Sequence, residues 1–213
     1  MAPSSSCTKP PSETAGPFPG DGTNGPDVLT QSGVVRQDIT SSFGSMTGVA
    51  GGVPLRLRLK MLDISNGCTP YAGAAMYVWH STREGGYSLY SNAVKDQNFL
   101  RGVQAADGEG WITFDTIFPG CYDGRWPHIH FEVFPSLLKT TKSSNKILTS
   151  QLAMPKDACD MVFATSGYES SVANFKRTSL QSDMVFRDGW AAQLPTVTGD
   201  VASGLVAQIN VPV

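Results

Sequence analysis

Two histidines separated by a single residue, His128 and His130, are the side chains of this sequence best placed to do chemistry. In a β-strand alternate side chains point to the same side, so both imidazoles share one face and Glu132 is the next residue along it. The apolar residues at positions 129, 131 and 133 then face the opposite way, as a core requires. Two imidazoles on one face can bind one metal ion.

The residues just before this pair add to the signal. A Pro119-Gly120 turn is followed by Tyr122 and Arg125, and a phenol, a guanidinium and two imidazoles so close together indicate a site. The alternative is that the pair is structural, because a His-x-His pair alone is a weak metal signal. The chain has three histidines and two lie in this pair. We interpret the third, His80, as structural.

Periodicity predicts mainly strands. Residues 53–64 alternate strictly between apolar and basic side chains, which indicates a half-buried strand. Further strands are expected near residues 33–39, 74–80, 102–105, 111–114, 128–133, 147–152 and 204–211. An Asp107-Gly108 pair predicts a hairpin turn. Residues 136–145 have the polar composition of a loop, whereas 156–163 and 168–175 favour one or two short helices.

The predicted fold is all-β, a single β-sandwich core with long loops and one or two short helices. Residues 1–27 are rich in Pro, Ser, Gly and Thr and predict an extended N-terminal arm, which leaves residues 28–213 as the β-sandwich domain that carries the candidate site. A parallel α/β sheet would need longer helices between its strands. A chain of 213 residues can bury a full core without disulfide bonds.

Composition excludes several function classes. The net charge is −2 and the charged residues are dispersed, which does not fit nucleic-acid or membrane-surface binding. No apolar run has transmembrane length. The low charged content, 16%, and the start Met1-Ala2-Pro3 fit the mature part of a secreted or cell-surface protein whose leader is not in this chain.

Four cysteines allow three complete pairings, which the sequence does not distinguish. Cys68 lies in a turn and Cys159 in a short helical stretch, and we expect one disulfide between them. Cys121 adjoins Tyr122. For Cys7 a free thiol, a disulfide and a lipid attachment in the precursor all stay open.

Several short segments together resemble the intradiol ring-cleavage dioxygenases, the family of catechol and protocatechuate dioxygenases. The segments that carry the resemblance are Trp79-His80, Gly86-Tyr87-Ser88, Gly102-Val103-Gln104, Asp107-Gly108, and residues 114–122 and 125–130. Thr14-Ala15-Gly16-Pro17 resembles a Thr-x-Gly-Pro motif of the family. The resemblance spans roughly residues 11–190. Within the family, the spacing of these segments is most similar to the extracellular branch. It implies a β-sandwich and a non-haem iron(III) enzyme.

By this resemblance the iron ligands are Tyr87, Tyr122, His128 and His130. Their chemistry agrees, because iron(III) is a hard cation that favours anionic oxygen donors, whereas a soft metal would favour thiolates. Alternatives remain for both tyrosines. Tyr122 could be a corner tyrosine bonded to the backbone, and Tyr90 lies three residues after Tyr87 in the same irregular segment.

The resemblance also gives roles to Arg125 and Gln151. Arg125 matches an arginine beside the substrate, whose fixed positive charge stabilises charge on the ring. Gln151 resembles a glutamine that supports this arginine. The alternatives are a surface salt bridge and an exposed strand glutamine. The loop of two residues before Arg125 is shorter than in protocatechuate enzymes, so contacts to a substrate carboxylate there do not transfer. Trp126-Pro127 replaces smaller residues of some relatives, from which we expect a differently shaped cavity wall.

The expected function is therefore cleavage of a catechol-type diol by O2 to a cis,cis-muconate-type diacid. The expected partners are the small aromatic diol and O2, with the oligomeric state open. A rival hypothesis is a non-catalytic secreted β-sandwich that binds carbohydrate or protein through surface aromatics, for which Tyr71, Tyr77, Trp111 and Trp190 are the candidates. A third is a metal-dependent hydrolase, for which Glu132 is the only nearby carboxylate; solvation or support of a ligand better explains that residue.

Overall fold

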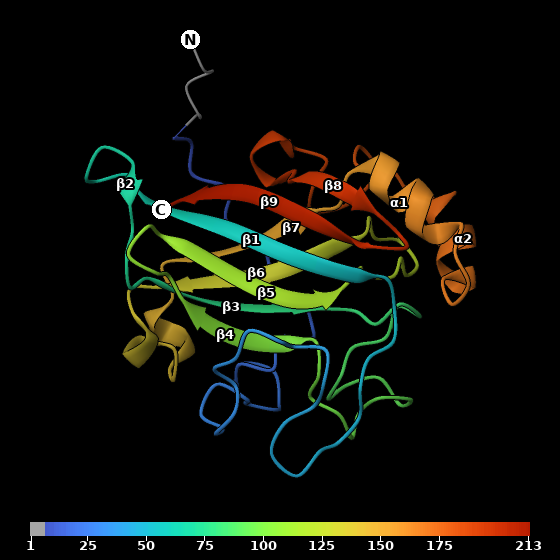
Figure 1. Cartoon of the computed structure of the whole chain (residues 1–213), viewed down its shortest axis with the longest axis horizontal. Coiled ribbons are helices and arrows are strands. Elements are labelled where there is room, and N and C mark those ends of the chain that lie inside the picture. Colours follow the sequence, from blue (N-terminus) through green and yellow to red (C-terminus); the bar gives the residue numbers. More distant parts are fainter. Residues whose placement is uncertain (1–6) are drawn as a thin grey trace.

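The computed structural model describes residues 7–213, and its strands form two sheets that lie one in front of the other (Figure 1). The longest strand, β1 (Pro54–Asp63), is the centre of the first sheet. It pairs antiparallel with β5 (Trp111–Ile117) and β2 (Thr69–Pro70) and parallel with β9 (Gly204–Pro212). An outer strand, β8 (Thr196–Asp200), pairs antiparallel with β9.

The alternation of β1 determines which way the first sheet faces. Leu55, Leu57 and Leu59 are at most 1% exposed, whereas Arg56 between them is exposed on the other face. Side chains two residues apart share a face, so a strand with this pattern buries one side against a second sheet and leaves the other in water.

The second sheet is antiparallel throughout, in the order β4 (Arg101–Ala105), β3 (Ala75–His80), β6 (His128–Phe134), β7 (Leu148–Ala153). Every residue of β3 and β6 is buried. On the inner face, Ile129, Phe131 and Val133 join the leucines of β1 in one hydrophobic cluster between the sheets. This cluster is the main core, and the sheets form a sandwich around it.

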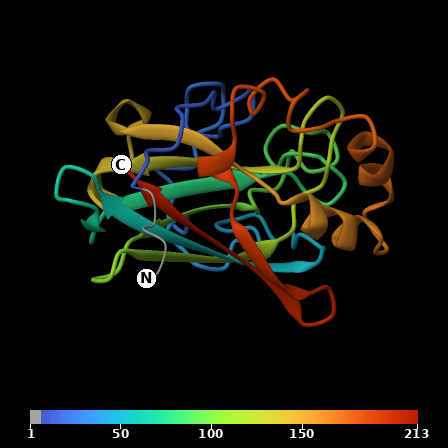
Figure 2. The same ribbon diagram turned by 90° about the horizontal axis from the view of Figure 1, so that it is seen from above.

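The outer face of the second sheet is covered by the N-terminal arm (blue in Figure 2). The backbone N–H of Glu13 donates to the carbonyl of Thr149 in β7 at 2.8 Å. The hydroxyl of Tyr77 in β3 donates to the carbonyl of Pro19 at 2.7 Å. Because the arm shields this face from water, polar side chains of β6 that point to it lie in a buried space.

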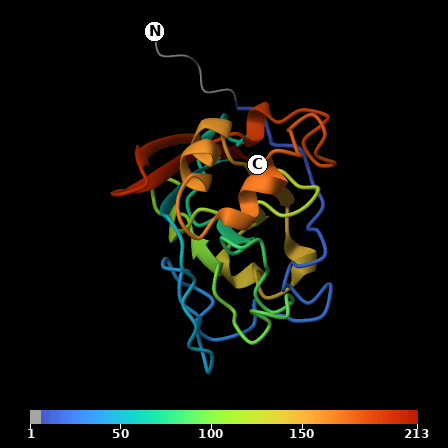
Figure 3. The ribbon, with the colours of Figure 1, turned by 90° about the vertical axis from the view of Figure 1, so that its right-hand side faces the viewer.

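Short helices complete the fold. Helices α1 (Lys156–Phe163) and α2 (Glu169–Phe175) lie together at one end of the sandwich (Figures 1 and 3). Single 3₁₀ turns occur at η1 (Leu137–Lys139), η2 (Ser143–Asn145) and η3 (Ala191–Gln193). Among the helices of residues 7–213, none has the length and apolar character needed to cross a bilayer.

The predicted all-β fold is confirmed, as are seven of the eight predicted strand positions and the short helices predicted at residues 156–163 and 168–175. The strand expected at residues 33–39 is wrong. That segment makes only isolated bridges, Val35 with Val103 of β4 and Asp38 with Asp115 of β5, because it crosses from one sheet to the other. The expected loop at 136–145 contains η1 and η2, and β8 was not predicted.

The predicted disulfide between Cys68 and Cys159 is also wrong. Cys68 is bonded to Cys7, which ties the arm to the turn after β1. Cys159 and Cys121 are free, buried thiols. Cys159 lies on the side of α1 that packs into the main core and is 0% exposed, so the surface turn that carries Cys68 is out of its reach.

Candidate metal centre

β6 places His128 and His130 side by side on the outer face of the second sheet. They are 2% and 3% exposed, and their Nε2 atoms are 3.1 Å apart. Regular pleating explains this, because the residues between and after them turn into the core. The sequence prediction that the two imidazoles share a face is thus confirmed.

Two loops bring phenol oxygens to the same place. Tyr87 lies in the loop between β3 and β4, and Tyr122 in the loop between β5 and β6. The Tyr87 oxygen is 3.3 Å from the Tyr122 oxygen and 3.3 Å from His128 Nε2. The Tyr122 oxygen is 3.1 Å from the same nitrogen. Tyr87, which precedes Tyr122 by 35 positions, therefore joins Tyr122, His128 and His130 in directing donor atoms to one point.

These separations fit donors that share one ion. Nitrogen and oxygen ligands of a transition metal such as zinc bind at about 2.0–2.2 Å, so pairs at coordination angles of about 90–110° lie about 2.8–3.6 Å apart. Within residues 7–213, no group of three or more His, Cys, Asp or Glu side chains could hold a metal ion. A metal at the two histidines would thus depend on the phenols.

The imidazoles have the protonation state that ligation requires. His128 Nδ1 lies 2.5 Å from the Trp126 carbonyl and donates to it, which leaves Nε2 with its lone pair toward the cluster. Burial lowers the pKa of His128 to about 3, and that of His130 well below its usual value. The Nδ1 atom of His130 is buried and, among the described residues, has no hydrogen-bond partner.

The phenols respond to burial in the opposite direction. Burial raises the pKa of Tyr87 well above 10, and it raises that of Tyr122, where the charge of Arg125 opposes it. In the protein alone both phenols are therefore neutral near pH 7. A cation would stabilise their phenolate forms, as it does for any acidic ligand. Two phenolates with two imidazoles, and no thiolate, suit a hard trivalent cation such as iron(III).

Arg125 and Gln151 lie in contact. Arg125 Nη2 donates to Gln151 Oε1 at 2.6 Å, and Gln151 Nε2 donates to the carbonyl of Thr14 in the arm at 2.9 Å. Gln151 is 0% exposed, so the alternative of an exposed strand glutamine is wrong. The arm continues along the cluster, because a Cβ added at Gly16 would lie 3.4 Å from His130 Cε1.

One hydrogen-bond partner of Arg125 was not predicted from the sequence. Its Nε donates to Asp183 Oδ2 at 2.9 Å, and the two side chains are 12% and 0% exposed. The alternative of a solvent-exposed surface salt bridge is therefore wrong. Asp183 lies in the loop after α2 and belongs to no recognisable motif, so nothing in the sequence indicated it.

Glu132, the third residue on the face of the two histidines, is not solvated. It is 0% exposed, and its Oε1 accepts from Lys146 Nζ at 2.7 Å. Lys146 also approaches Asp21 of the arm, at 3.4 Å. Burial raises the pKa of Glu132 to about 7, although Lys146 opposes the shift. Glu132 is thus linked to the arm through Lys146, which pairs with both carboxylates.

His80 makes structural contacts, as predicted. Its Nε2 lies 2.7 Å from Thr116 Oγ1 and its Nδ1 2.8 Å from the carbonyl of Ser81, so both ring nitrogens are occupied. Of the aromatics proposed for a binding platform, Tyr77 is 0% exposed and bonded to the arm. Trp111 is covered by Arg58 and Lys60, whose cationic atoms lie 4.4 and 4.8 Å from its ring.

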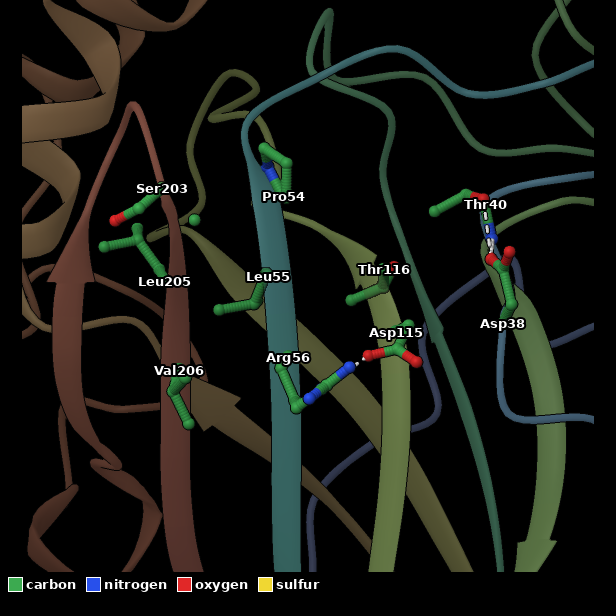
Figure 4. Close-up of a pocket in the computed structure, with 11 residues that line it drawn as sticks. Asp38, Thr40, Pro54, Leu55, Arg56, Asp115, Thr116, Ser203, Leu205 and Val206 are labelled. Atoms are coloured by element: carbon green, nitrogen blue, oxygen red, sulfur yellow. Dashed lines mark hydrogen bonds and ion pairs between the residues drawn. The ribbon is translucent and has the colours of Figure 1, made fainter.

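One hollow elsewhere on the surface is unrelated to the cluster. It has a volume of about 360 Å³ and lies over β1, β5 and β9 on the first sheet (Figure 4). An ion pair between Arg56 and Asp115 crosses it at 2.7 Å. None of the six candidate site residues lines it.

Comparison with known proteins agrees with this geometry. Residues 24–178 match a family model described as Dioxygenase, and the chain belongs to the intradiol ring-cleavage dioxygenase family. A 55-residue segment is 46% identical to chlorocatechol 1,2-dioxygenase of Rhodococcus opacus, and it covers 26% of this chain and 21% of that protein. The sequence match thus spans about a fifth of that relative's length.

Solved structures share the fold over almost the whole chain. An intradiol ring-cleavage dioxygenase from Tetranychus urticae superposes with a TM-score of 0.74 at 23% identity and covers 97% of this chain and 96% of its own. The dioxygenase domain of a dioxygenase carbohydrate-binding protein fusion from the bacterium Streptomyces sp. SirexAA-E has a TM-score of 0.59 at 20% identity, with 96% and 97% covered. At these identities the likeness concerns the fold.

Proposed function

We propose that this protein is an iron(III)-dependent intradiol dioxygenase that cleaves a catechol-type ring with O2 to a cis,cis-muconate-type diacid. The observation that carries the proposal is the convergence of Tyr87, Tyr122, His128 and His130, whose donor atoms lie 3.1–3.3 Å from their neighbours. Ferric iron held there supplies a Lewis acid and an electron acceptor that makes a bound catechol reactive toward O2. Both atoms of O2 enter the diacid, so no external reductant is needed.

The protein's own groups bind, orient and move protons. Tyr122 is partly exposed whereas Tyr87 is 1% exposed, so Tyr122 is the phenol that a substrate can reach. In the proposed cycle the Tyr122 oxygen accepts a proton from a substrate hydroxyl. The guanidinium of Arg125, fixed by Gln151, stabilises negative charge that develops on the ring. The arm and the buried outer face exclude water.

An oxygen-uptake panel with iron quantified in the same sample tests the function. Catechol, hydroxyquinol, protocatechuate and lignin-derived catechols are the substrates to compare, because neither the cluster nor the fold selects among them. We expect one O2 consumed per ring and the absorption spectrum of a muconate-type product. An iron-loaded protein that consumes no O2 with any of them, or an extradiol product spectrum, would contradict the proposal.

Substitution of Arg125 separates binding of iron from turnover. Arg125→Ala is expected to retain iron, because the guanidinium donates to Asp183 and Gln151, and the backbone N–H that donates to the Tyr122 carbonyl stays in place in alanine. Turnover per iron should fall, since the variant lacks the charge beside the substrate. Wild-type turnover in this variant would remove Arg125 from the mechanism.

A secreted or cell-surface location is also proposed. The Cys7–Cys68 disulfide supports it, because disulfides persist in oxidising compartments. Trapping of thiols in freshly harvested protein from the native source tests it. The two cysteines should be unavailable to a thiol reagent until a reductant is added, and prompt labelling of both would contradict the location.

A further inference from the structure

The loop that follows α2 brings a buried carboxylate, Asp183, to the substrate side of the candidate centre. Residue 183 lies beyond the segment that matches the family model, residues 24–178. Its side chain is 0% exposed. A fully buried carboxylate is costly unless charged and hydrogen-bonding partners surround it, so its contacts should reveal what it does.

All acceptor positions of this carboxylate face donors. Oδ2 accepts from Arg125 Nε at 2.9 Å and from the backbone N–H of Trp126 at 2.7 Å. Oδ1 accepts from the backbone N–H groups of Val185, at 2.8 Å, and Phe186, at 3.3 Å. One oxygen therefore binds the arginine segment, and the other fixes the carboxylate to its own loop.

The loop itself is packed in place. Val185 and Phe186 form a hydrophobic cluster with Trp126 and Ala153 of β7. The Trp126 indole N–H donates to the carbonyl of Met154 at 2.8 Å. Because apolar packing holds the loop directly after the carboxylate, Asp183 can act as a rigid support.

Arg125 is thereby held at two different nitrogens. Asp183 binds Nε and Gln151 binds Nη2, and two hydrogen bonds on different atoms of a planar guanidinium define its plane. Within the described residues no hydrogen bond involves Nη1. A second partner is needed because Gln151 alone would leave the guanidinium free to rotate about a single contact.

We propose that Asp183 is a positioning residue that fixes the guanidinium of Arg125 for the ring-cleavage reaction, an inference that rests on the proposed function. Asp183 acts through Arg125 and touches neither substrate nor metal. Burial raises the pKa of this carboxyl, but Arg125 and the backbone donors outweigh burial and lower it, so the support is an anion. Removal of supporting contacts of this kind typically costs about 10–100-fold in activity.

Asp183→Asn is the central variant. Every hydrogen-bond partner of the carboxylate is a donor. The amide nitrogen of asparagine also only donates, so the variant loses both hydrogen bonds of the oxygen that this nitrogen replaces. The matched control is Asp188→Asn, the same change at an exposed residue of the same loop. We expect kcat per bound iron to fall about 10–100-fold in Asp183→Asn with a smaller change in KM, and to stay at the wild-type value in the control.

A double-mutant cycle separates positioning from general support. If Asp183 acts through Arg125, Asp183→Asn should change kcat by less than about twofold in an Arg125→Ala background. The phenolate-to-iron absorption band of the holoprotein should stay at the wild-type position. An equal loss of kcat in both backgrounds, a shifted band, or an unchanged rate in Asp183→Asn would overturn the inference.

A variant that does not fold and a wild-type protein without activity are the two further outcomes of these experiments. If Asp183→Asn does not fold, Asp183→Glu, which keeps the charge but displaces it by one methylene, replaces it in the same cycle with the same criteria. If iron-loaded wild-type protein consumes no O2 with any catechol, the proposed function fails and this inference fails with it. If the iron-loaded wild-type protein is active but the losses of kcat in the double-mutant cycle are additive, this inference is overturned and the proposed function is not.

Discussion

The imidazole of His130 lies flat on the indole of Trp79, with ring centroids 4.8 Å apart and planes 6° apart. Trp79 in turn stacks on Tyr77, at 5.0 Å and 21°. Both aromatic residues are 0% exposed. Since His130 Nδ1 has no hydrogen-bond partner among residues 7–213, the stack on Trp79 orients this ring where a hydrogen bond at Nδ1 otherwise would. Trp79 thus supports a candidate ligand directly.

Removal of the stack should therefore weaken iron binding. Trp79→Ala is expected to lower iron affinity about 10–100-fold, because the His130 ring gains rotational freedom. It should also lower the free energy of unfolding by about 3–5 kcal/mol. Trp79→Phe is the control, since it keeps an aromatic face and removes a buried indole N–H that has no hydrogen-bond partner in the described part of the chain. Chelator competition and urea unfolding measure both effects, and unchanged iron affinity in Trp79→Ala would refute the role.

Three tyrosines allow the candidate phenolate ligands to be separated from a neighbour. Charge transfer from phenolate to iron(III) should make the holoprotein red to purple. Tyr87→Phe and Tyr122→Phe should each bind less iron and lose part of this absorption. Burial keeps both phenols neutral unless a cation binds them, so the phenolates that give the colour depend on the metal. Tyr90→Phe should keep the colour, since the Tyr90 hydroxyl donates to the Asn24 carbonyl of the arm. Absorption spectra with iron quantified provide the measurement, and a colourless Tyr90→Phe protein with intact Tyr87 would reverse the assignment.

The parts of the site that follow a local period could be predicted from sequence. Alternation places His128 and His130 on one face whatever the remaining fold, because the period of a strand is two. The choice between Tyr87 and Tyr90 is different. Both lie in an irregular loop, and only the path of that loop against the arm decides which phenol reaches the histidines.

Contacts between distant loops could not be predicted. Asp183 and Arg125 are 58 positions apart, and no periodicity or motif connects them. The edge strand β8 has a Gly199 and exposed polar residues, so its pattern matches a loop until β9 supplies the hydrogen bonds. The prediction of the disulfide was wrong for a related reason, since the pairing depends on which turn of the folded protein the arm reaches.

That disulfide should contribute to stability and little to the metal centre. Cys7→Ser is expected to lower the free energy of unfolding by about 2–4 kcal/mol, because the bond closes a long loop in the unfolded chain, where the two cysteines are 61 positions apart. Iron content should be unchanged, since Thr14 and Pro19 keep their own hydrogen bonds to Gln151 and Tyr77. Urea unfolding with and without reductant measures the difference. Wild-type protein that is equally stable in both would contradict the prediction, and Cys7→Ser should not respond to reductant.

Acid sensitivity should come in part from His80. Burial lowers its pKa from 6.5 to about 4, although the Ser81 carbonyl favours the charged form. Below pH 6.5 the unfolded chain binds this proton before the folded chain does, so the stability contributed by the neutral ring is complete above pH 6.5 and is lost as the pH falls toward 4. The loss is about 3 kcal/mol at about 1.4 kcal/mol per unit. His80→Gln has no titrating group at this position. Between pH 7 and pH 4 its free energy of unfolding should therefore fall less than that of the wild-type protein, and the difference should be about this amount. Urea unfolding at a series of pH values compares the two proteins, and parallel curves would show that His80 is not the titrating group.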